Sequence, residues 1–440
     1  MSDPAALPPQ TGAEDGALEE LRAAWQELNE IVEEIRQVQG YENFLTAPTF
    51  DDVSAAAVQP LCYISATDTE GIALVVRKDG DVDPVVLPHL TTDSVRSRVS
   101  ALLTSYDEFQ ADPSVAAGPW TKDLDKTTRW LWGTVMEPLL EAVEEDPAIT
   151  LVTGGLLGLL PLHAAWTPDQ TRPTGRAYAL DTTTISYAPN ARSLTAARRV
   201  AAERRRQTLL AVVNPQPMPS GYRPTPFTEL EASVIEKAAR GGARSLAGAE
   251  ATLPNVRREL LAADVVHFAC HGHADLADPL ESGLVLSGGQ ALRVRDLLEM
   301  DLRIRIAVLS SCEASLPGTE LPDEVIGLPT GLLQAGAAGV VAPLWAVPDV
   351  RTSMLMTEFY RDWHSASWTP AEALRRAQIW LRDTTNEEKV EVWERALDDD
   401  SAWPGPDVAD ALLDLVLPRE PDRRDESLLH LWAAFSHVGV

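Results

Sequence analysis

Four short apolar runs, separated by segments with helical periodicity, constrain what the second half of this chain can fold into. They occupy residues 209–213, 264–269, 306–311 and 339–343. Strands this short and apolar are typical of a sheet buried on both faces, and the helical segments between them supply the crossovers that parallel strands need. The pattern predicts an α/β fold around a mostly parallel sheet.

The first half of the chain has weaker strand patterns, at residues 60–64, 71–77, 82–87, 149–153 and 185–189. We expect three regions: a disordered tail with an N-terminal helix over 1–59, an N-terminal α/β half over 60–206, and a second α/β half over 207–440. The helix at 17–39 carries one apolar stripe, which either faces the body of the protein or docks a partner or second copy.

Charge and cysteine content restrict the partners and the compartment. The chain has 37 Lys and Arg against 66 Asp and Glu, a formal net charge of −29, which disfavours nucleic acid and anionic membrane surfaces. Three cysteines do not suggest a disulfide framework. Neither a signal peptide nor an apolar run of membrane-spanning length is present, so we expect a cytoplasmic protein.

A histidine and a cysteine follow two of the apolar runs. His271 comes after the run at 264–269, and Cys312 after the run at 306–311. Ligands bind at the carboxyl ends of strands in open parallel sheets, so these residues form a candidate thiolate–imidazole pair. The backbone N–H groups of Gly272 and Cys312 are candidate oxyanion donors.

Other histidines and cysteines nearby favour simpler interpretations. We expect His267 to be buried and hydrogen-bonded, and Cys270 to be a small core residue on the opposite face of its strand. A zinc site of the HxHxDH type is the alternative, but Leu276 stands where that pattern needs its last histidine. We therefore predict no metal and no cofactor.

Several motifs, in order, resemble the CHAT domain, a caspase-like, separase-related family of clan CD cysteine peptidases. The resemblance covers about residues 60–440. The segments that carry it are 157–165, 185–189, 267–273 (His-Phe-Ala-Cys-His-Gly-His), 282–287, 309–313 (Leu-Ser-Ser-Cys-Glu), 336–345 and 431–435.

The resemblance implies a caspase-like three-layer sandwich around a mostly parallel sheet, preceded by a pseudo-caspase-like N-terminal half without the dyad. It implies that His271 is the catalytic base and Cys312 the nucleophile of a cysteine endopeptidase. Related proteins act in bacterial immunity and regulated cell death, and are held silent until a partner or signal acts. The implied partners are a protein or peptide substrate and a protein activator.

The sequence also departs from its relatives. Many carry a long tetratricopeptide sensor region, whereas only about sixty residues precede the domain here. Ser310 stands where metacaspase-type relatives have an aspartate that selects basic P1 residues. Candidate residues for the substrate pocket are Asn214, Glu313, Asp323, Glu324 and Trp345. The alternative function is a non-catalytic scaffold or sensor that acts by protein binding.

Overall fold

The computed structural model spans residues 1–440. It describes all except 1–11, 39–45, 204–207, 221, 223–224, 240–241, 274, 276–277, 311–326, 365–368 and 400, and the side chains of 12–22, 115–116 and 362–364. The chain forms two units, residues 1–50 and residues 51–440. The boundary expected near residue 207 separates no such units, and remains a prediction about the halves of the larger one.

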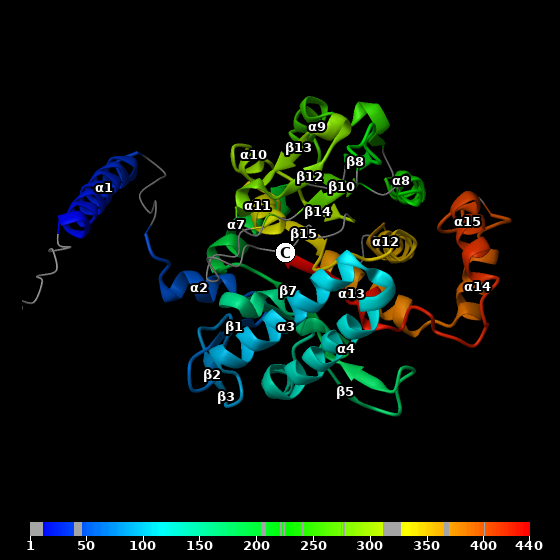
Figure 1. The fold of residues 1–440 in the computed structure, drawn as a ribbon, viewed down its shortest axis with the longest axis horizontal. Helices are drawn as coiled ribbons and strands as arrows, with labels where there is room; N and C mark the ends of the chain where they lie inside the picture. Colours follow the sequence, from blue (N-terminus) through cyan, green and yellow to red (C-terminus); the bar gives the residue numbers. More distant parts are fainter. Residues whose placement is uncertain are drawn as a thin grey trace, which may run out of the picture. The chain divides into compact units, whose positions relative to one another are not determined.

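An eleven-stranded sheet runs through the larger unit (Figure 1). Its order is β3-β2-β1-β4-β7-β16-β15-β14-β10-β8-β9. The strands of this sheet are β1 (Leu61–Ala66), β2 (Gly71–Val76), β3 (Val82–Leu87), β4 (Ala148–Thr153), β7 (Thr184–Tyr187), β8 (Leu209–Val213), β9 (Ala243–Ala247), β10 (Val265–Ala269), β14 (Ile306–Leu309), β15 (Gly339–Pro343) and β16 (Phe435–Gly439).

Smaller sheets and helices complete the unit. The small strands are β5 (Trp166–Pro168), β6 (Arg176–Tyr178), β11 (Gly272–His273), β12 (Gly283–Val285) and β13 (Ala291–Arg293). The helices are α2 (Phe50–Ala56), α3 (Thr92–Ala111), α4 (Pro113–Leu131), α5 (Glu137–Ala142), α6 (Ala179–Thr182), α7 (Ala191–Glu203), α8 (Thr228–Ala238), α9 (Leu253–Leu260), α10 (Val294–Leu298), α11 (Leu328–Gln334), α12 (Asp349–His364), α13 (Pro370–Asp383), α14 (Asn386–Glu394), α15 (Pro406–Val416) and α16 (Leu429–Trp432).

The large sheet contains two parallel blocks. Strands β1, β4, β7 and β16 run parallel to one another, as do β15, β14, β10, β8 and β9. The blocks meet at the antiparallel pair β15–β16, so the strands of the two blocks run in opposite directions and their carboxyl ends lie on opposite sides of the sheet. The mostly parallel α/β sheet predicted from the sequence is confirmed.

Alternating residues of the strands bury themselves in two separate hydrophobic clusters. In β8, Leu209, Ala211 and Val213 pack with α8 and α12, whereas Leu210 and Val212 pack with α9, α10 and α11. Helices therefore cover both faces of this part of the sheet, which confirms the three-layer sandwich. Burying each Val or Leu side chain contributes about 1.5–3 kcal/mol to the free energy of unfolding. Because such side chains are buried on both faces, the sheet is held between the two layers of helices.

Three expectations about individual elements were incomplete. Edge strand β9 was not predicted, because its sequence Ala-Arg-Ser-Leu-Ala lacks an apolar run. The sequence predicts only one helix in the acidic, proline-containing segment 384–425, around 387–397, whereas helix α15 lies there as well. It also predicts a last strand over 429–437, but the strand begins at Phe435, because Leu429–Trp432 forms the short helix α16.

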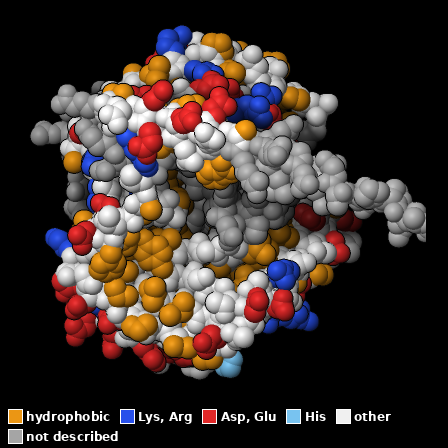
Figure 2. All heavy atoms as spheres, turned by 90° about the vertical axis from the view of Figure 1, so that its left-hand side faces the viewer, with side chains coloured by type: hydrophobic (Ala, Val, Ile, Leu, Met, Phe, Trp, Pro, Cys, Tyr) orange, Lys and Arg blue, Asp and Glu red, His pale blue; other side chains and the backbone are white. Residues whose placement is uncertain are grey.

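The edge of the large sheet formed by β3 and its neighbour β2 is partly apolar. Figure 2 shows hydrophobic side chains gathered on the lower part of the face that carries this edge. Within β2 and β3, Ile72, Val82 and Val86 are large and exposed. Edge strand β3 also contains Pro84, which lacks a backbone N–H and so weakens pairing with a further strand.

The smaller unit contains helix α1 (Gly12–Arg36), which begins earlier than the sequence predicted. Within this unit Val32 is buried, whereas Trp25, Leu28 and Ile31 are exposed. Across the described parts of the chain, no helix combines the length and the apolarity needed to cross a bilayer.

Candidate active site

His271 lies just beyond the carboxyl end of β10, the strand between β8 and β14. Its backbone carbonyl accepts a 2.7 Å hydrogen bond from the N–H of Val285. The next residue, Gly272, opposes Leu284 in the β11–β12 pair. The small hairpin sheet therefore fixes the backbone of His271, whose side chain is half-buried rather than sealed in the core.

The strand that leads to Cys312 is aligned with β10. Phe268 of β10 faces Leu309 of β14 in the parallel register. Ser310 then donates two hydrogen bonds to the carbonyl of Phe268, from its N–H at 3.0 Å and from its hydroxyl at 3.2 Å. Cys312 itself, with the pocket candidates Glu313, Asp323 and Glu324, lies outside the described residues.

A hollow of about 290 Å³ opens next to His271. Tyr222 lines it, and the ring of Tyr222 lies 5.1 Å from the ring of His271, centroid to centroid. The sequence candidate Asn214 also lines it. Asn214 has a φ of +42°, a left-handed conformation that asparagine tolerates better than most residues and that turns the chain sharply at the end of β8.

Trp345, the other described pocket candidate, occupies a different environment. Its side chain is buried, and its indole N–H donates a 3.0 Å hydrogen bond to the carbonyl of His430. Its ring meets Trp120 edge to face at a centroid distance of 5.9 Å. Trp345 thus packs in the core and does not line the hollow beside His271.

His267 anchors β10 from within the core, as its position in the strand predicted. It is fully buried, and its ring nitrogens lie 3.0 Å from Tyr360 Oη and 3.0 Å from Glu231 Oε2. Ser353 donates a 3.1 Å hydrogen bond to the other oxygen of Glu231. Burial raises the pKa of Tyr360 well above its usual value, so its hydroxyl stays protonated.

The same buried network reaches the segment that lines the hollow. Asp349 accepts a 2.9 Å hydrogen bond from the N–H of Phe227, and Ser353 donates to the Phe227 carbonyl at 3.2 Å. Burial raises the pKa of Asp349 to about 6; the Phe227 N–H opposes the shift and Glu231 adds to it. The network thus ties the strand before His271 to the segment after Tyr222. The sequence alone offered no signal for these partners, which come from α8 and α12.

The other two cysteines are core residues. Burial raises the pKa of both Cys62 and Cys270 to about 12. Both thiols are therefore protonated and unreactive at neutral pH. The prediction that Cys270 is a small core residue is confirmed.

His163 is also a core residue. Its ring nitrogens lie 2.9 Å from Tyr187 Oη and 2.9 Å from the carbonyl oxygen of Ala433. Burial lowers its pKa to about 4, so the ring is neutral at physiological pH.

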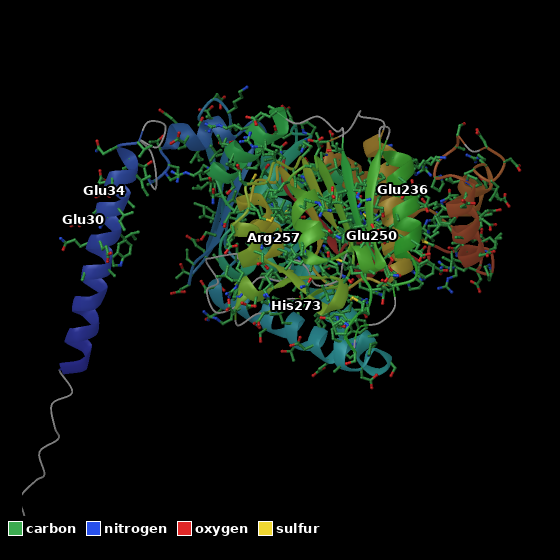
Figure 3. The ribbon with its side chains drawn as sticks, turned by 90° about the horizontal axis from the view of Figure 1, so that it is seen from above. Glu30, Glu34, Glu236, Glu250, Arg257 and His273 are labelled. Carbon is green, nitrogen blue, oxygen red and sulfur yellow. The ribbon has the colours of Figure 1, made fainter. Side chains whose placement is uncertain are left out.

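The zinc alternative involves the histidines on either side of His271. His273, labelled in Figure 3, lies in β11, two residues after His271. Both ring nitrogens of His267 are engaged by Tyr360 and Glu231, so this histidine has no nitrogen left for a metal ion. Among the residues that the structure describes, no three His, Cys, Asp or Glu side chains form a group that could hold one.

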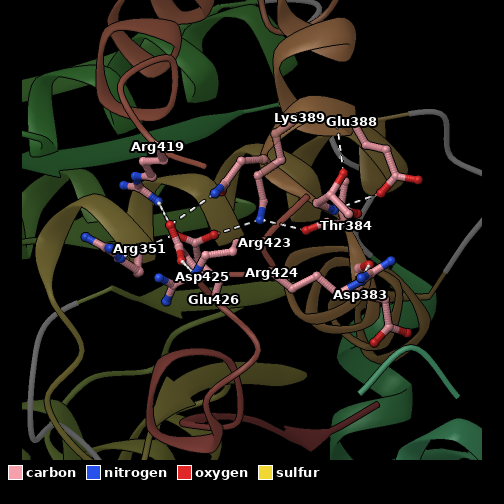
Figure 4. Close-up of polar contacts among 12 residues, drawn as sticks. Arg351, Asp383, Thr384, Glu388, Lys389, Arg419, Arg423, Arg424, Asp425 and Glu426 are labelled. Atoms are coloured by element: carbon pink, nitrogen blue, oxygen red, sulfur yellow. Dashed lines mark hydrogen bonds and ion pairs between the residues drawn. The ribbon is translucent and has the colours of Figure 1, made fainter. Parts of the chain in front are cut away.

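A second buried polar cluster fixes the C-terminal helices (Figure 4). Lys389 and Glu426 are both fully buried, with 2.7 Å between Nζ and Oε2. Arg419 and Arg351 contact the other oxygen of Glu426 at 2.6 and 3.5 Å. Lys389 also donates a 3.0 Å hydrogen bond to the carbonyl of Thr384. This cluster is structural, since the buried carboxylate of Glu426 pairs with three cations from different segments of the protein.

Comparisons with known proteins agree with this architecture. The family model of the CHAT domain matches residues 125–440. Tetratricopeptide repeat protein 28 of Mus musculus is 28% identical over a stretch that covers 35% of this chain and 8% of the mouse protein. The Saccharomyces cerevisiae separase–securin complex contains a chain that aligns with a TM-score of 0.51 at 10% identity, over 75% of this chain and 29% of that one.

This chain therefore spans only a small part of either relative. The separase match, at such low identity, supports the fold alone. The family model covers more than half of the chain, and it includes β10, β14 and both motifs that follow them. The chain belongs to the CHAT domain family and has the caspase-like fold of clan CD cysteine peptidases.

Proposed function

We propose that this protein is a cysteine endopeptidase in which His271 is the general base and Cys312 the nucleophile. The observation that carries the proposal is the register of β10 and β14. His271 is three residues beyond Phe268, and Cys312 is three residues beyond its partner Leu309. Adjacent strands lie about 4.8 Å apart, so we expect equal extensions beyond Phe268 and Leu309 to bring the imidazole and the thiol close together at the carboxyl ends of the two strands.

The reaction then needs no metal or cofactor. The imidazole of His271 takes the thiol proton of Cys312, and the thiolate attacks the carbonyl carbon of the peptide bond. Backbone N–H groups of Gly272 and Cys312 stabilise the oxyanion. The C–N bond breaks as the imidazolium protonates the leaving amine. Water, deprotonated by His271, hydrolyses the thioester and restores the free thiol.

The proposed partners are proteins. The net charge of −29 opposes binding to nucleic acid and to anionic membrane surfaces. Separase was solved in complex with securin, and the mouse relative is named for tetratricopeptide repeats. We propose that a protein activator switches the peptidase on in the cytoplasm, within a bacterial defence or regulated cell-death pathway, as the family resemblance implies.

A paired-variant digest tests this function. Wild type, Cys312→Ala and the core control Cys270→Ala are each incubated with a peptide library, with and without lysate of the source cell as a supply of activator. We expect cleavage by wild type and by Cys270→Ala, and none by Cys312→Ala. The same proteins are also produced in the source cell. If neither wild type nor Cys312→Ala cuts a peptide, yet both cause the same response in that cell, the protein would instead be a scaffold or sensor that acts by binding.

A further inference from the structure

The large sheet has an exposed apolar face at the end formed by β1, β2 and β3, far along the strand order from β10 and the proposed active site. We propose that this face binds an amphipathic helix of another protein, one that carries Lys or Arg residues beside its apolar stripe. The inference does not depend on peptidase activity. Three observations carry it: the composition of the face, its closed edge and the charges that border it.

Both faces of these three antiparallel strands are mainly apolar. The inner face, with residues such as Ala73 and Val75, packs in the main hydrophobic cluster. Where an antiparallel sheet meets water on one side, its outer positions are usually polar. Here the outer positions include no charged residue. They are Leu61, Tyr63, Ser65, Ile72, Leu74, Val76, Val82, Pro84 and Val86.

Helix α2 covers only part of this outer face. Its last residue Ala56 and the following Ala57 pack with Leu61 and Val76. Figure 2 shows hydrophobic side chains gathered at this end of the sheet. Exposed apolar patches of this kind mark interaction surfaces, so we infer that a further element covers the face. The exposed residues are Ile72 (37%), Val82 (38%) and Val86 (55%).

The edge of the sheet argues against a strand as the covering element. Pro84 lies within edge strand β3 and has no backbone N–H to offer to a further strand. An added strand would also extend the sheet sideways and leave its outer face exposed. A helix instead lays an apolar stripe across the face, as α3 does on the inner face through Val95 and Val99.

The border of the face is mainly acidic. The turns that join its strands, residues 67–70 and 77–81, contain four exposed carboxylates and two basic residues. Of the basic residues, Arg77 is paired with Asp83 and Asp146 at 3.2 and 2.8 Å, whereas Lys78 is exposed. The carboxylates are Asp68, Glu70, Asp79 and Asp81. The border therefore favours a partner with positive charge.

The same charge argues against two other occupants. A second copy of this chain has the same net charge of −29, and a symmetric contact through this face would bring the two acidic borders together. An anionic lipid surface would be repelled for the same reason. A helix with Lys or Arg on both sides of an apolar stripe suits the face and its border together.

Photo-crosslinking in the source cell tests this surface. The full-length protein carries p-benzoylphenylalanine in place of Val86 or, as a matched control, in place of Leu261, which is exposed at the end of α9. Mass spectrometry identifies the cross-linked segments. We expect position 86 to cross-link to another protein, in a segment with apolar residues three and four apart and Lys or Arg beside them. Adding Ile72→Ser should lower the yield at least fivefold, whereas adding Leu417→Ser, at another exposed site, should leave it unchanged.

Every other outcome overturns the inference. A cross-link from position 86 to a second copy, to another segment of the same chain or to lipid assigns the face to a different occupant. A partner segment that is acidic, or that lacks helical spacing, does the same. A yield no higher than at position 261, or one that Ile72→Ser does not change, shows that the face is not a binding surface. None of these results bears on the peptidase, which is judged separately by cleavage that depends on Cys312.

Discussion

Phe268 and Leu309 face each other across the parallel pair β10–β14, and this register aligns the carboxyl ends of the two strands. His267, one residue before Phe268, is locked by Glu231 and Tyr360. Ser310, one residue after Leu309, is hydrogen-bonded back to Phe268. The strand that carries the proposed base is thus held from the core and from its neighbour, as positioned catalytic groups require.

Alkylation should distinguish the three cysteines under native conditions. Because burial raises the pKa of Cys62 and Cys270 to about 12, their thiolates are essentially absent at pH 7.5. We expect iodoacetamide to modify Cys312 alone, as read by peptide mass spectrometry, and all three cysteines in urea. Native labelling of Cys270 at the rate of Cys312 would contradict the assignment of Cys270 to the core.

Replacing Glu231 by Leu should destabilise the protein markedly. The change leaves a buried His267 nitrogen without its partner and removes one of the acceptors of the Ser353 hydroxyl, at a cost of about 3 kcal/mol in the free energy of unfolding. The control is Glu229→Leu, on an exposed position of the same helix, where we expect less than about 0.5 kcal/mol. Urea denaturation measures both, and equal effects would rule out a special role for the network.

The cluster around Glu426 gives a second stability prediction. Lys389→Met removes a fully buried charge and leaves Glu426 to two arginines, so we expect a loss of about 3 kcal/mol. Arg395→Met breaks the exposed pair with Glu391 and should cost less than about 0.5 kcal/mol. Thermal unfolding of both variants provides the comparison. A loss as small for Lys389→Met as for Arg395→Met would show that the buried pair contributes little.

Asp349 should make stability depend on pH in a defined direction. Its pKa rises from the ordinary 3.8 to about 6 in the folded protein, so the folded state holds the proton more tightly than the unfolded state. Its contribution therefore falls as pH rises from about 4 to about 6, and stays low above that range. Allowing for solvent screening, we expect a change of about 1 kcal/mol.

The variant Asp349→Asn isolates this effect, because the amide oxygen can still accept the Phe227 N–H. The difference in unfolding free energy between variant and wild type should grow in favour of the variant from pH 4 to pH 6.5. Chemical denaturation across that range measures it. A difference that stays constant, or that shrinks, would contradict the raised pKa.

Much of this architecture follows from local patterns. The apolar runs at 209–213 and 339–343 became β8 and β15, because burial on both faces leaves a continuous apolar signature. The burial of His267 followed from its place inside such a run. Period-two alternation also placed Cys270 on the opposite face from His271, in the core.

Other features depend on contacts between distant segments, which leave no local signal. The Glu231–His267–Tyr360 network joins residues on three elements, and nothing in the sequence near Glu231 marks it as buried. Tyr222 reaches His271 only because β8 and β10 are neighbours in the sheet. Trp345, one of the candidate pocket residues, packs against Trp120 in the core, and that contact between distant segments has no local signal either.

The most direct test of the central claim compares His271→Ala and Cys312→Ala with wild type, with Cys270→Ala as the matched control. The measurement is peptide-library cleavage in the presence of source-cell lysate, alongside the unfolding free energy of each protein. We predict that either dyad substitution abolishes cleavage while the unfolding free energy stays within about 1 kcal/mol of wild type. Full cleavage by Cys312→Ala, or by His271→Ala, would contradict the proposed mechanism.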